Sequence, residues 1–219
     1  MKNSIEMLST SPLFQGIKEG DLENMLSCLG ATIRNYGRNE VILVEGEPVG
    51  KVGVILKGCV QVMKEDVFGN RTILEQVGQG ELFGAAYACA KVDRSPVSVT
   101  AVEDSAILQL DVRRVLDICP AACQFHQELV RNMVYILAGK NVLLGEKIRH
   151  ISRRTTREKL LSYLSDQSKK AGSRYFSIPF DRQGLADYLC VERSAMSAEL
   201  GKLKKEGMLD FRKREFWLK

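Results

Sequence analysis

The chain has 219 residues, a length that suits one or two domains and is ample for a buried core. Hydrophobic residues make up 45% of it and charged residues 27%, and no low-complexity tract occurs, so a mainly disordered protein is excluded. No apolar run reaches the roughly 18 residues of a membrane span, and the first residues lack the apolar core of a signal peptide. We therefore expect a cytoplasmic protein with no membrane partner.

The net charge of +5 is unevenly distributed along the chain. Residues 1–120 carry 12 Lys and Arg against 16 Asp and Glu, whereas residues 150–219 carry 16 against 9. A basic terminal unit beside an acidic one is typical of a domain that meets polyanions, most often nucleic acid. A solvated basic face is the alternative interpretation of the same charges.

The six cysteines include no CxxC pair, so neither a zinc ribbon, a thioredoxin motif nor a disulfide framework is supported. Each is most simply a small buried apolar residue. Cys119 and Cys123 stand four apart at the start of a predicted helix, so a redox or metal role for this pair is an alternative. We predict no metal site.

In chain order, the first predicted element is a short helix over residues 21–29, where Leu and Met recur at helical spacing after Asp21. From Ile33 to Asp111 the sequence changes to short β-branched runs. These runs are separated by glycines at nearly equal intervals: Gly46, Gly58, Gly69 and Gly80. Regular turn signals at this spacing predict an antiparallel roll of about eight strands, with one hairpin turn at residues 68–71.

A long helix is predicted over residues 121–150. It is much longer than a typical helix of a globular domain, and its apolar stripe suits a parallel partner helix. The predicted dimerisation residues are Leu129, Met133, Ile136, Leu137 and Leu144. The alternative is that this stripe packs only against the chain's own β-domain.

A capping box at Thr155–Glu158 begins the next helix, so the domain boundary falls near residues 152–155. A short strand, two close helical segments and a terminal hairpin follow. The predicted fold is α+β: a cupin-like antiparallel β-roll (double-stranded β-helix) over 1–120, a dimerisation helix over 121–152 and a winged helix-turn-helix over 153–219.

The segment from Asp181 to Lys205 has the apolar spacing of a helix-turn-helix. The predicted core positions are Leu185, Ala186 and Leu189 in the first helix, Val191 in the turn, and Met196, Leu200 and Leu203 in the second helix. The second helix starts near Glu192, an unusual N-cap. A Gly at 184, inside the first helix, costs about 1 kcal/mol relative to Ala.

The place of each residue in the predicted helix-turn-helix indicates its role in DNA binding. The exposed N-terminal end of the second helix, which enters the major groove in this motif, carries Arg193, Ser194, Ser197 and Ala198. Arg193 can read guanine O6 and N7, and the serines can reach bases or phosphates. Candidates for phosphate contact are Arg182, Gln183, Lys202, Lys204, Arg212, Lys213 and Arg214.

Taken together, the roll, the long helix and the segment RQGLADYLCVERSAMSAEL resemble the CRP/FNR superfamily of bacterial transcription regulators. The resemblance runs from about Leu13 to Leu218. It implies a homodimer joined along the long helix, a small effector in each roll, and a palindromic site on double-stranded DNA, with RNA polymerase as a further candidate partner. It also implies that Arg193 is the main base-reading residue, with Ser194 and Ala198 at the other specificity positions.

Cyclic-AMP-binding members carry a Glu after the glycines that holds the ribose, and an Arg–Ser pair that holds the phosphate. Here Gly84 is followed by Ala85 and Ala86, so that Glu is missing, while Arg94 and Ser95 are present. An Arg beside a Ser can bind a phosphate or carboxylate, although Arg94 as an exposed turn residue is the alternative. We expect these five residues to bind an unidentified apolar or acidic small molecule other than cyclic AMP.

Other functions receive less support. Iron–sulfur members use an N-terminal Cys cluster, and haem members need an axial ligand, yet both His residues (126 and 150) lie on the long helix. A metalloenzyme of cupin type needs two or three His inside the roll, and none lies before residue 126. We therefore expect a regulator rather than an enzyme, with a protein-binding adaptor that does not read DNA as the alternative.

Overall fold

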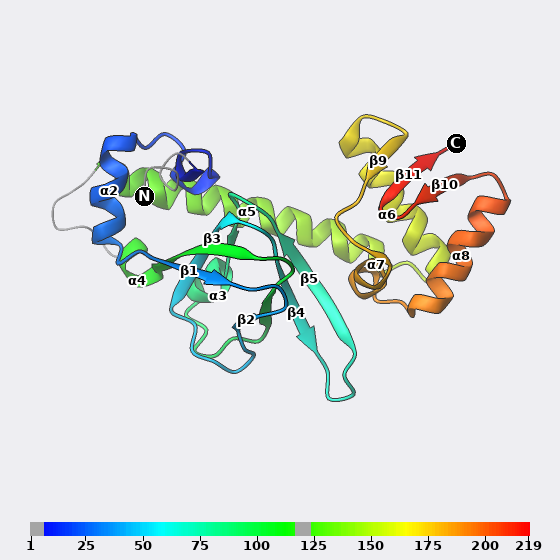
Figure 1. Cartoon of the computed structure of the whole chain (residues 1–219), viewed down its shortest axis with the longest axis horizontal. Helices are drawn as coiled ribbons and strands as arrows, with labels where there is room; N and C mark the ends of the chain where they lie inside the picture. Colours follow the sequence, from blue (N-terminus) through cyan, green and yellow to red (C-terminus); the bar gives the residue numbers. More distant parts are fainter. Residues whose placement is uncertain (1–6, 117–123) are drawn as a thin grey trace. The chain divides into compact units, whose positions relative to one another are not determined.

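The computed structural model describes residues 7–116 and 124–219, so Cys119, Cys123 and the expected boundary at 120/121 lie outside the described residues. The chain divides into two compact units (Figure 1). Unit 1 comprises Met1–Gly69 with Leu74–Asn141, and unit 2 comprises Asn70–Ile73 with Val142–Lys219. No helix within the described ranges is both long and apolar enough to cross a membrane.

Unit 1 begins with helical segments that cover its core. A short 3₁₀ helix, η1 (Pro12–Phe14), precedes α2 (Glu19–Cys28), which starts two residues before the predicted helix. Leu22 and Met25 on α2 are fully buried, as the helical spacing of the apolar residues requires.

The predicted roll is confirmed as two four-stranded antiparallel sheets with the orders β1-β8-β3-β6 and β2-β7-β4-β5. The strands are β1 (Thr32–Tyr36), β2 (Val41–Leu43), β3 (Lys51–Lys57), β4 (Val60–Glu65), β5 (Arg71–Val77), β6 (Leu82–Phe83), β7 (Ser98–Ala101) and β8 (Ser105–Asp111). All four predicted turn glycines have φ between 80° and 89°. At Gly58 a Cβ atom would lie 2.7 Å from the backbone oxygen of Asp104, so only glycine fits this turn.

Two short helices interrupt the strand pattern. The helix α4 (Val112–Leu116) follows β8 at the place where the sequence becomes helical. The sequence does not predict the helix α3 (Ala85–Cys89), because its five residues are too few to show helical periodicity.

The long helix α5 (Gln124–Ile151) packs one side against the core of unit 1. Leu129 is fully buried there, Met133 is 2% exposed, and Ile136 and Leu137 pack against the same core. The amide of Asn132 donates hydrogen bonds to the backbone oxygen atoms of Leu13 and Gln15 at 3.0 and 2.8 Å. The predicted dimer seam is therefore wrong for Leu129 and Met133, because the chain's own roll covers them and leaves no surface for a partner.

Another set of apolar side chains on α5 is exposed in the single chain. Tyr135 is 68% exposed, Val142 66%, Ile148 61% and Val134 56%; Leu144, one of the predicted seam residues, is 48% exposed. Val134, Tyr135 and Val142 lie within about 100° of one another around the helix axis, whereas Ile148 lies about 120° from Val142. The apolar residues of α5 therefore fall into two sets: one is buried in the monomer, and the other is exposed and can contact a partner.

Unit 2 contains the predicted winged helix-turn-helix. The helix α6 (Thr156–Ala171) starts at the predicted capping box. The Glu158 backbone N–H donates to Thr155 Oγ1, and the Thr155 backbone N–H donates to Glu158 Oε2, both at 3.2 Å. The remaining elements are β9 (Tyr175–Ser177), α7 (Arg182–Leu189), α8 (Arg193–Lys205), β10 (Leu209–Arg212) and β11 (Glu215–Leu218). The last two strands form a hairpin, and β11 also pairs with β9.

The last turns of α5 are part of unit 2 and bury two polar side chains. Lys147, 5% exposed, donates from Nζ to the backbone oxygen of Ile73 and lies 4.4 Å from the ring centre of Tyr188. Burial lowers the pKa of Lys147 to about 8, since desolvation disfavours the charged form. His150, 2% exposed, lies 2.8 Å from the hydroxyl of Ser162.

Candidate functional site

Specific side chains hold backbone groups at both ends of α7. The carboxylate of Asp181 caps α7 by accepting from the Gly184 N–H at 2.8 Å. A Cβ at Gly184 would lie 3.3 Å from that carboxylate, which explains a glycine inside the helix. At the other end of α7, Cys190 adopts a left-handed conformation (φ 52°), and Lys159 donates to its carbonyl oxygen at 3.2 Å.

The helix-turn-helix core is formed by the predicted residues. Leu185, Ala186 and Leu189 of α7 and Met196, Leu200 and Leu203 of α8 are all fully buried in one cluster, while Val191 packs against it. Burial of these six side chains fixes which side of α8 faces outward. Arg193, Ser194, Ser197, Ala198 and Lys202 are all exposed on that outward side.

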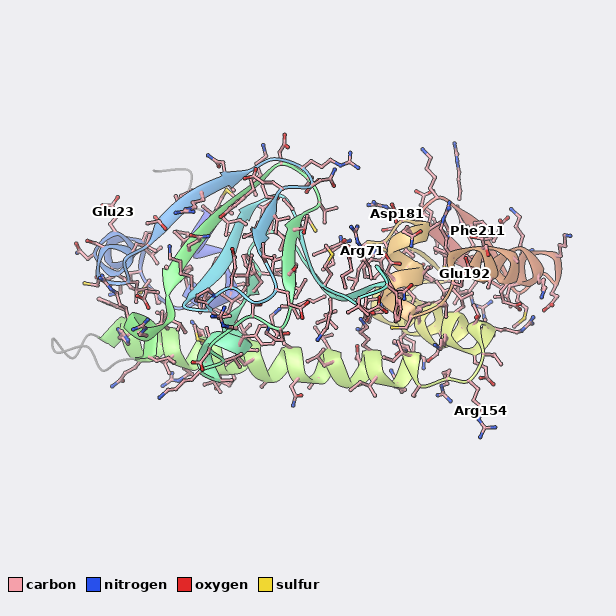
Figure 2. All side chains as sticks on the ribbon, turned by 90° about the horizontal axis from the view of Figure 1, so that it is seen from below. Glu23, Arg71, Arg154, Asp181, Glu192 and Phe211 are labelled. Atoms are coloured by element: carbon pink, nitrogen blue, oxygen red, sulfur yellow. The ribbon has the colours of Figure 1, made fainter. Side chains whose placement is uncertain are left out.

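At the N-terminal end of α8, which Figure 2 marks by the label of Glu192, the side chain of Glu192 caps the first turn. Its Oε2 atom accepts hydrogen bonds from the Ala195 N–H at 2.8 Å and from the hydroxyl of Ser194. The Arg193 guanidinium beside it makes no hydrogen bond or ion pair with any described residue, so its donors are available to a ligand.

The outer part of α8 is held to α6 by an ion-pair network. Arg157 pairs with Glu199 at 3.2 Å and with Glu206, and Lys202 also pairs with Glu199 at 3.2 Å. The Arg157 network orients α8 relative to α6, and sequence analysis missed it because Arg157 and its partners are distant in the sequence. Lys202 remains largely exposed and can exchange Glu199 for another anion.

The hairpin of β10 and β11 forms a basic depression with the start of α7. The depression has a volume of about 730 Å³ and is lined by Ser177, Asp181, Arg182, Arg212, Lys213, Arg214 and Glu215. Arg182 is half-buried and lies 4.5 Å from the ring centre of Phe211, so it packs as well as carrying charge. Two other predicted phosphate contacts have internal partners: Gln183 donates to Asp187 at 2.7 Å, and Lys204 pairs with Asp210 at 2.5 Å.

The predicted effector residues lie in unit 1. Gly84 has φ 80° and precedes α3, whose first residue, Ala85, is buried and whose second, Ala86, is exposed. Arg94 is exposed and donates to the backbone oxygen of Gly46 at 2.8 Å, which leaves guanidinium donors free. Ser95 is 2% exposed and its hydroxyl donates to the backbone oxygen of Val97 at 2.6 Å, so in this structure Ser95 supports the loop.

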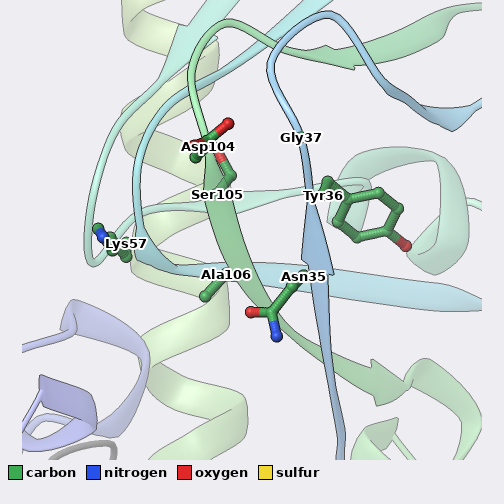
Figure 3. Close-up of a pocket in the computed structure, with 7 residues that line it drawn as sticks. All are labelled: Asn35, Tyr36, Gly37, Lys57, Asp104, Ser105 and Ala106. Atoms are coloured by element: carbon green, nitrogen blue, oxygen red, sulfur yellow. The ribbon is translucent and has the colours of Figure 1, made fainter.

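Another depression, of about 390 Å³, lies in unit 1 where β1 and β3 end and β8 begins (Figure 3). Two of its polar side chains are bonded within the chain: the carboxylate of Asp104 accepts from the Arg38 N–H at 3.0 Å, and the hydroxyl of Ser105 donates to the Glu103 oxygen at 2.7 Å. We assign no ligand to this depression.

Comparison with known families agrees with this architecture. Residues 33–121 match the family model described as a cyclic nucleotide-binding domain, and residues 158–219 match the Crp-like helix-turn-helix domain. The chain belongs to the CRP/FNR superfamily of transcription regulators. The match to the helix-turn-helix domain indicates DNA binding, and members of this superfamily are regulators rather than enzymes.

Individual relatives of this regulator are distant in sequence. A cyclic AMP receptor protein of Thermus thermophilus is 24% identical over 191 residues, which cover 87% of this chain and 79% of the relative. The c-di-GMP-responsive global regulator CLP of Xanthomonas campestris has a TM-score of 0.75 at 18% identity, covering 92% of this chain and 99% of CLP. FixK2 of Bradyrhizobium japonicum has a TM-score of 0.66 at 22% identity, covering 86% and 92%. The two solved structures are therefore similar in fold.

Proposed function

We propose that this CRP/FNR regulator acts as a homodimer that binds a palindromic DNA site through paired α8 helices, under the control of a small effector in the roll. The observation that carries the proposal is the exposed N-terminal end of α8, where the Arg193 guanidinium makes no hydrogen bond or ion pair with a described residue. An Arg at this position of a recognition helix can donate a bidentate pair of hydrogen bonds to guanine O6 and N7.

Sequence-independent affinity for DNA would come from the basic side chains of unit 2. Arg182, Arg212, Lys213 and Arg214 line one depression of unit 2, and Lys202 is exposed on the recognition helix itself. Neutralising phosphates releases counterions, so DNA binding should weaken steeply as salt increases. The positive charge of residues 150–219 fits this role.

Dimerisation would use the exposed apolar side of α5. Three apolar side chains on this side, each more than half exposed, would be an unusual solvent-facing surface on a monomer: Val134, Tyr135 and Val142. Parallel pairing of two α5 helices would cover them and place the two α8 helices around a two-fold axis. Half-sites about one helical turn apart follow from that symmetry.

The effector would bind near α3 and Arg94, with Gly84, Ala85, Ala86 and Ser95 shaping the site. The guanidinium donors of Arg94 that remain free fit a phosphate or carboxylate. Because Ala85 and Ala86 replace the acidic residue of cyclic-AMP-binding members, an acidic or apolar small molecule other than cyclic AMP is the preferred ligand. Its binding would bias the arrangement of the α5 pair, coupling two separate sites.

The test is selection of bound fragments from random duplex DNA by the full chain, at two salt concentrations, with and without a pool of cell metabolites. A palindromic motif whose enrichment depends on the pool supports the proposal. We expect Arg193→Ala to weaken binding by about 1 to 3 kcal/mol and to relax one base pair in each half-site. We expect Lys202→Ala to weaken all sequences alike and to reduce the salt dependence. Absence of any motif under all conditions would favour a protein-binding adaptor.

A further inference from the structure

The carboxylate of Glu192 is an unusual group at the DNA-facing end of α8. Helices most often begin with Ser, Thr, Asp or Asn, whereas α8 begins with the longer side chain of Glu192. Hydrogen bonds from the Ser194 hydroxyl and the Ala195 N–H lower the pKa of Glu192, so the carboxylate is ionised near neutral pH. A negative charge is thus fixed at the tip of the recognition helix.

This charge changes what the tip of α8 can contact. A helix N-terminus carries about half a positive charge and free N–H groups, and so attracts phosphates. Glu192 already compensates that charge and accepts from the Ala195 N–H, so a DNA phosphate at the same place would meet a like charge. The end of α8 is therefore better suited to a base edge than to the sugar–phosphate backbone.

The base that fits a carboxylate follows from the groups in the major groove. A carboxylate only accepts hydrogen bonds, and the major-groove donors are the N4 amino group of cytosine and the N6 amino group of adenine. Adenine also presents the N7 acceptor beside its amino group, which repels a carboxylate, and guanine and thymine present acceptors. Cytosine is the base that matches Glu192.

The geometry leaves the carboxylate able to make that contact. The hydrogen bonds from the Ser194 hydroxyl and from the Ala195 N–H both use Oε2, and a carboxylate has acceptor positions on both oxygens. Glu192 is exposed, and the neighbouring Arg193 is exposed as well. The hydroxyl proton of Ser194 is engaged by Glu192, so Ser194 acts as a positioning residue for that carboxylate.

We propose that Glu192 reads sequence by accepting a hydrogen bond from the N4 amino group of a cytosine in each half-site, next to the guanine read by Arg193. This inference rests on the proposed function, because it requires α8 to lie in the major groove. Glu192 thereby joins Arg193 among the residues that read bases, and its carboxylate excludes adenine, guanine and thymine at one base position of each half-site.

The test is selection from random duplex DNA by the full chain and by two variants, Glu192→Ser and Glu192→Gln. Serine is a favoured N-cap, so Glu192→Ser keeps the start of α8 and removes only the charged reader. The unsubstituted protein should prefer cytosine at one position of each half-site by about tenfold. Glu192→Ser should lose that preference and keep the guanine read by Arg193, and Glu192→Gln should shift the preference to adenine, whose N6 and N7 match an amide.

Ser194→Ala provides a test of the positioning role. It should reduce the cytosine preference while leaving the thermal unfolding midpoint and the preference for guanine unchanged. A protein with a merely structural Ser194 would lose stability and keep its cytosine preference.

Other outcomes would overturn the inference. A motif that keeps its cytosine in Glu192→Ser, or that never contains one, rules out base reading by Glu192. Tighter binding of Glu192→Ser to all sequences, with an unchanged motif, would show that Glu192 acts only by repelling phosphates. If the unsubstituted protein selects no motif at all, the proposed function itself fails. This outcome differs from a motif that does not depend on Glu192, which overturns only the inference.

Discussion

Replacement of Val142 by Ala measures how much the exposed side of α5 contributes to dimer formation. Val142 is 66% exposed in the single chain. Complete burial of a Val side chain contributes about 1.5 kcal/mol, nearly all of it from the two methyl groups that Ala lacks. Two-thirds of this is about 1 kcal/mol, and a two-fold dimer contains two copies, so the substitution should weaken the dimer by about 2 kcal/mol. Sedimentation equilibrium should show a dimer dissociation constant about thirtyfold higher.

Leu129→Ala is the matched control on the opposite side of the same helix. Leu129 is fully buried in unit 1, so its truncation should lower the free energy of unfolding by about 2 to 5 kcal/mol and leave the dimer dissociation constant nearly unchanged. A dimer weakened by Leu129→Ala but not by Val142→Ala would refute the assignment of the two sides of α5.

Two further substitutions test unit 2. Cys190 holds a left-handed conformation that glycine adopts without strain, so Cys190→Gly should have a free energy of unfolding about 1 kcal/mol higher than Cys190→Ala. Urea titrations measure this difference, and equal stabilities of the two variants would refute the strain at Cys190. Lys147→Met tests the buried ammonium. The pKa of Lys147 is lowered to about 8 in the folded chain, so the unfolded chain binds more protons between about pH 8 and 10.5, and the free energy of unfolding should rise with pH in that window. This rise, on the order of 3 kcal/mol, should be absent in Lys147→Met, and an identical pH profile for the two proteins would contradict the burial of a charged Lys147.

Much of the fold could be predicted from the sequence because local signals agree with the structure. The four turn glycines, the capping box at Thr155 and the alternation of buried residues along α7 and α8 each depend on residues close together in the chain. Such signals specify turns, helix starts and buried faces without knowledge of the partner that covers them. The exposed side of α8, and with it the position of Arg193, follows directly from the buried side.

What could not be predicted depends on partners distant in the chain. The apolar stripe of α5 gives no indication of which side the roll covers, so residue spacing alone places Leu129 and Met133 in the dimer seam, although they pack in the monomer. The stacking of Arg182 on Phe211 likewise joins residues that lie on different elements, far apart in the sequence. The engagement of Ser194 by Glu192 is local, but it depends on a side-chain rotamer that residue spacing does not determine.

The most direct test of a dimer that reads DNA through Arg193 is dimethyl sulfate protection of a selected duplex, since this reagent methylates guanine N7 in the major groove. With the full chain bound, we expect one protected guanine in each half-site, with the two half-sites about one helical turn apart. Arg193→Ala, at a concentration that saturates the DNA, should leave both guanines reactive. Protection that persists in Arg193→Ala, or that occurs in a single half-site, would contradict paired recognition helices with Arg193 on guanine.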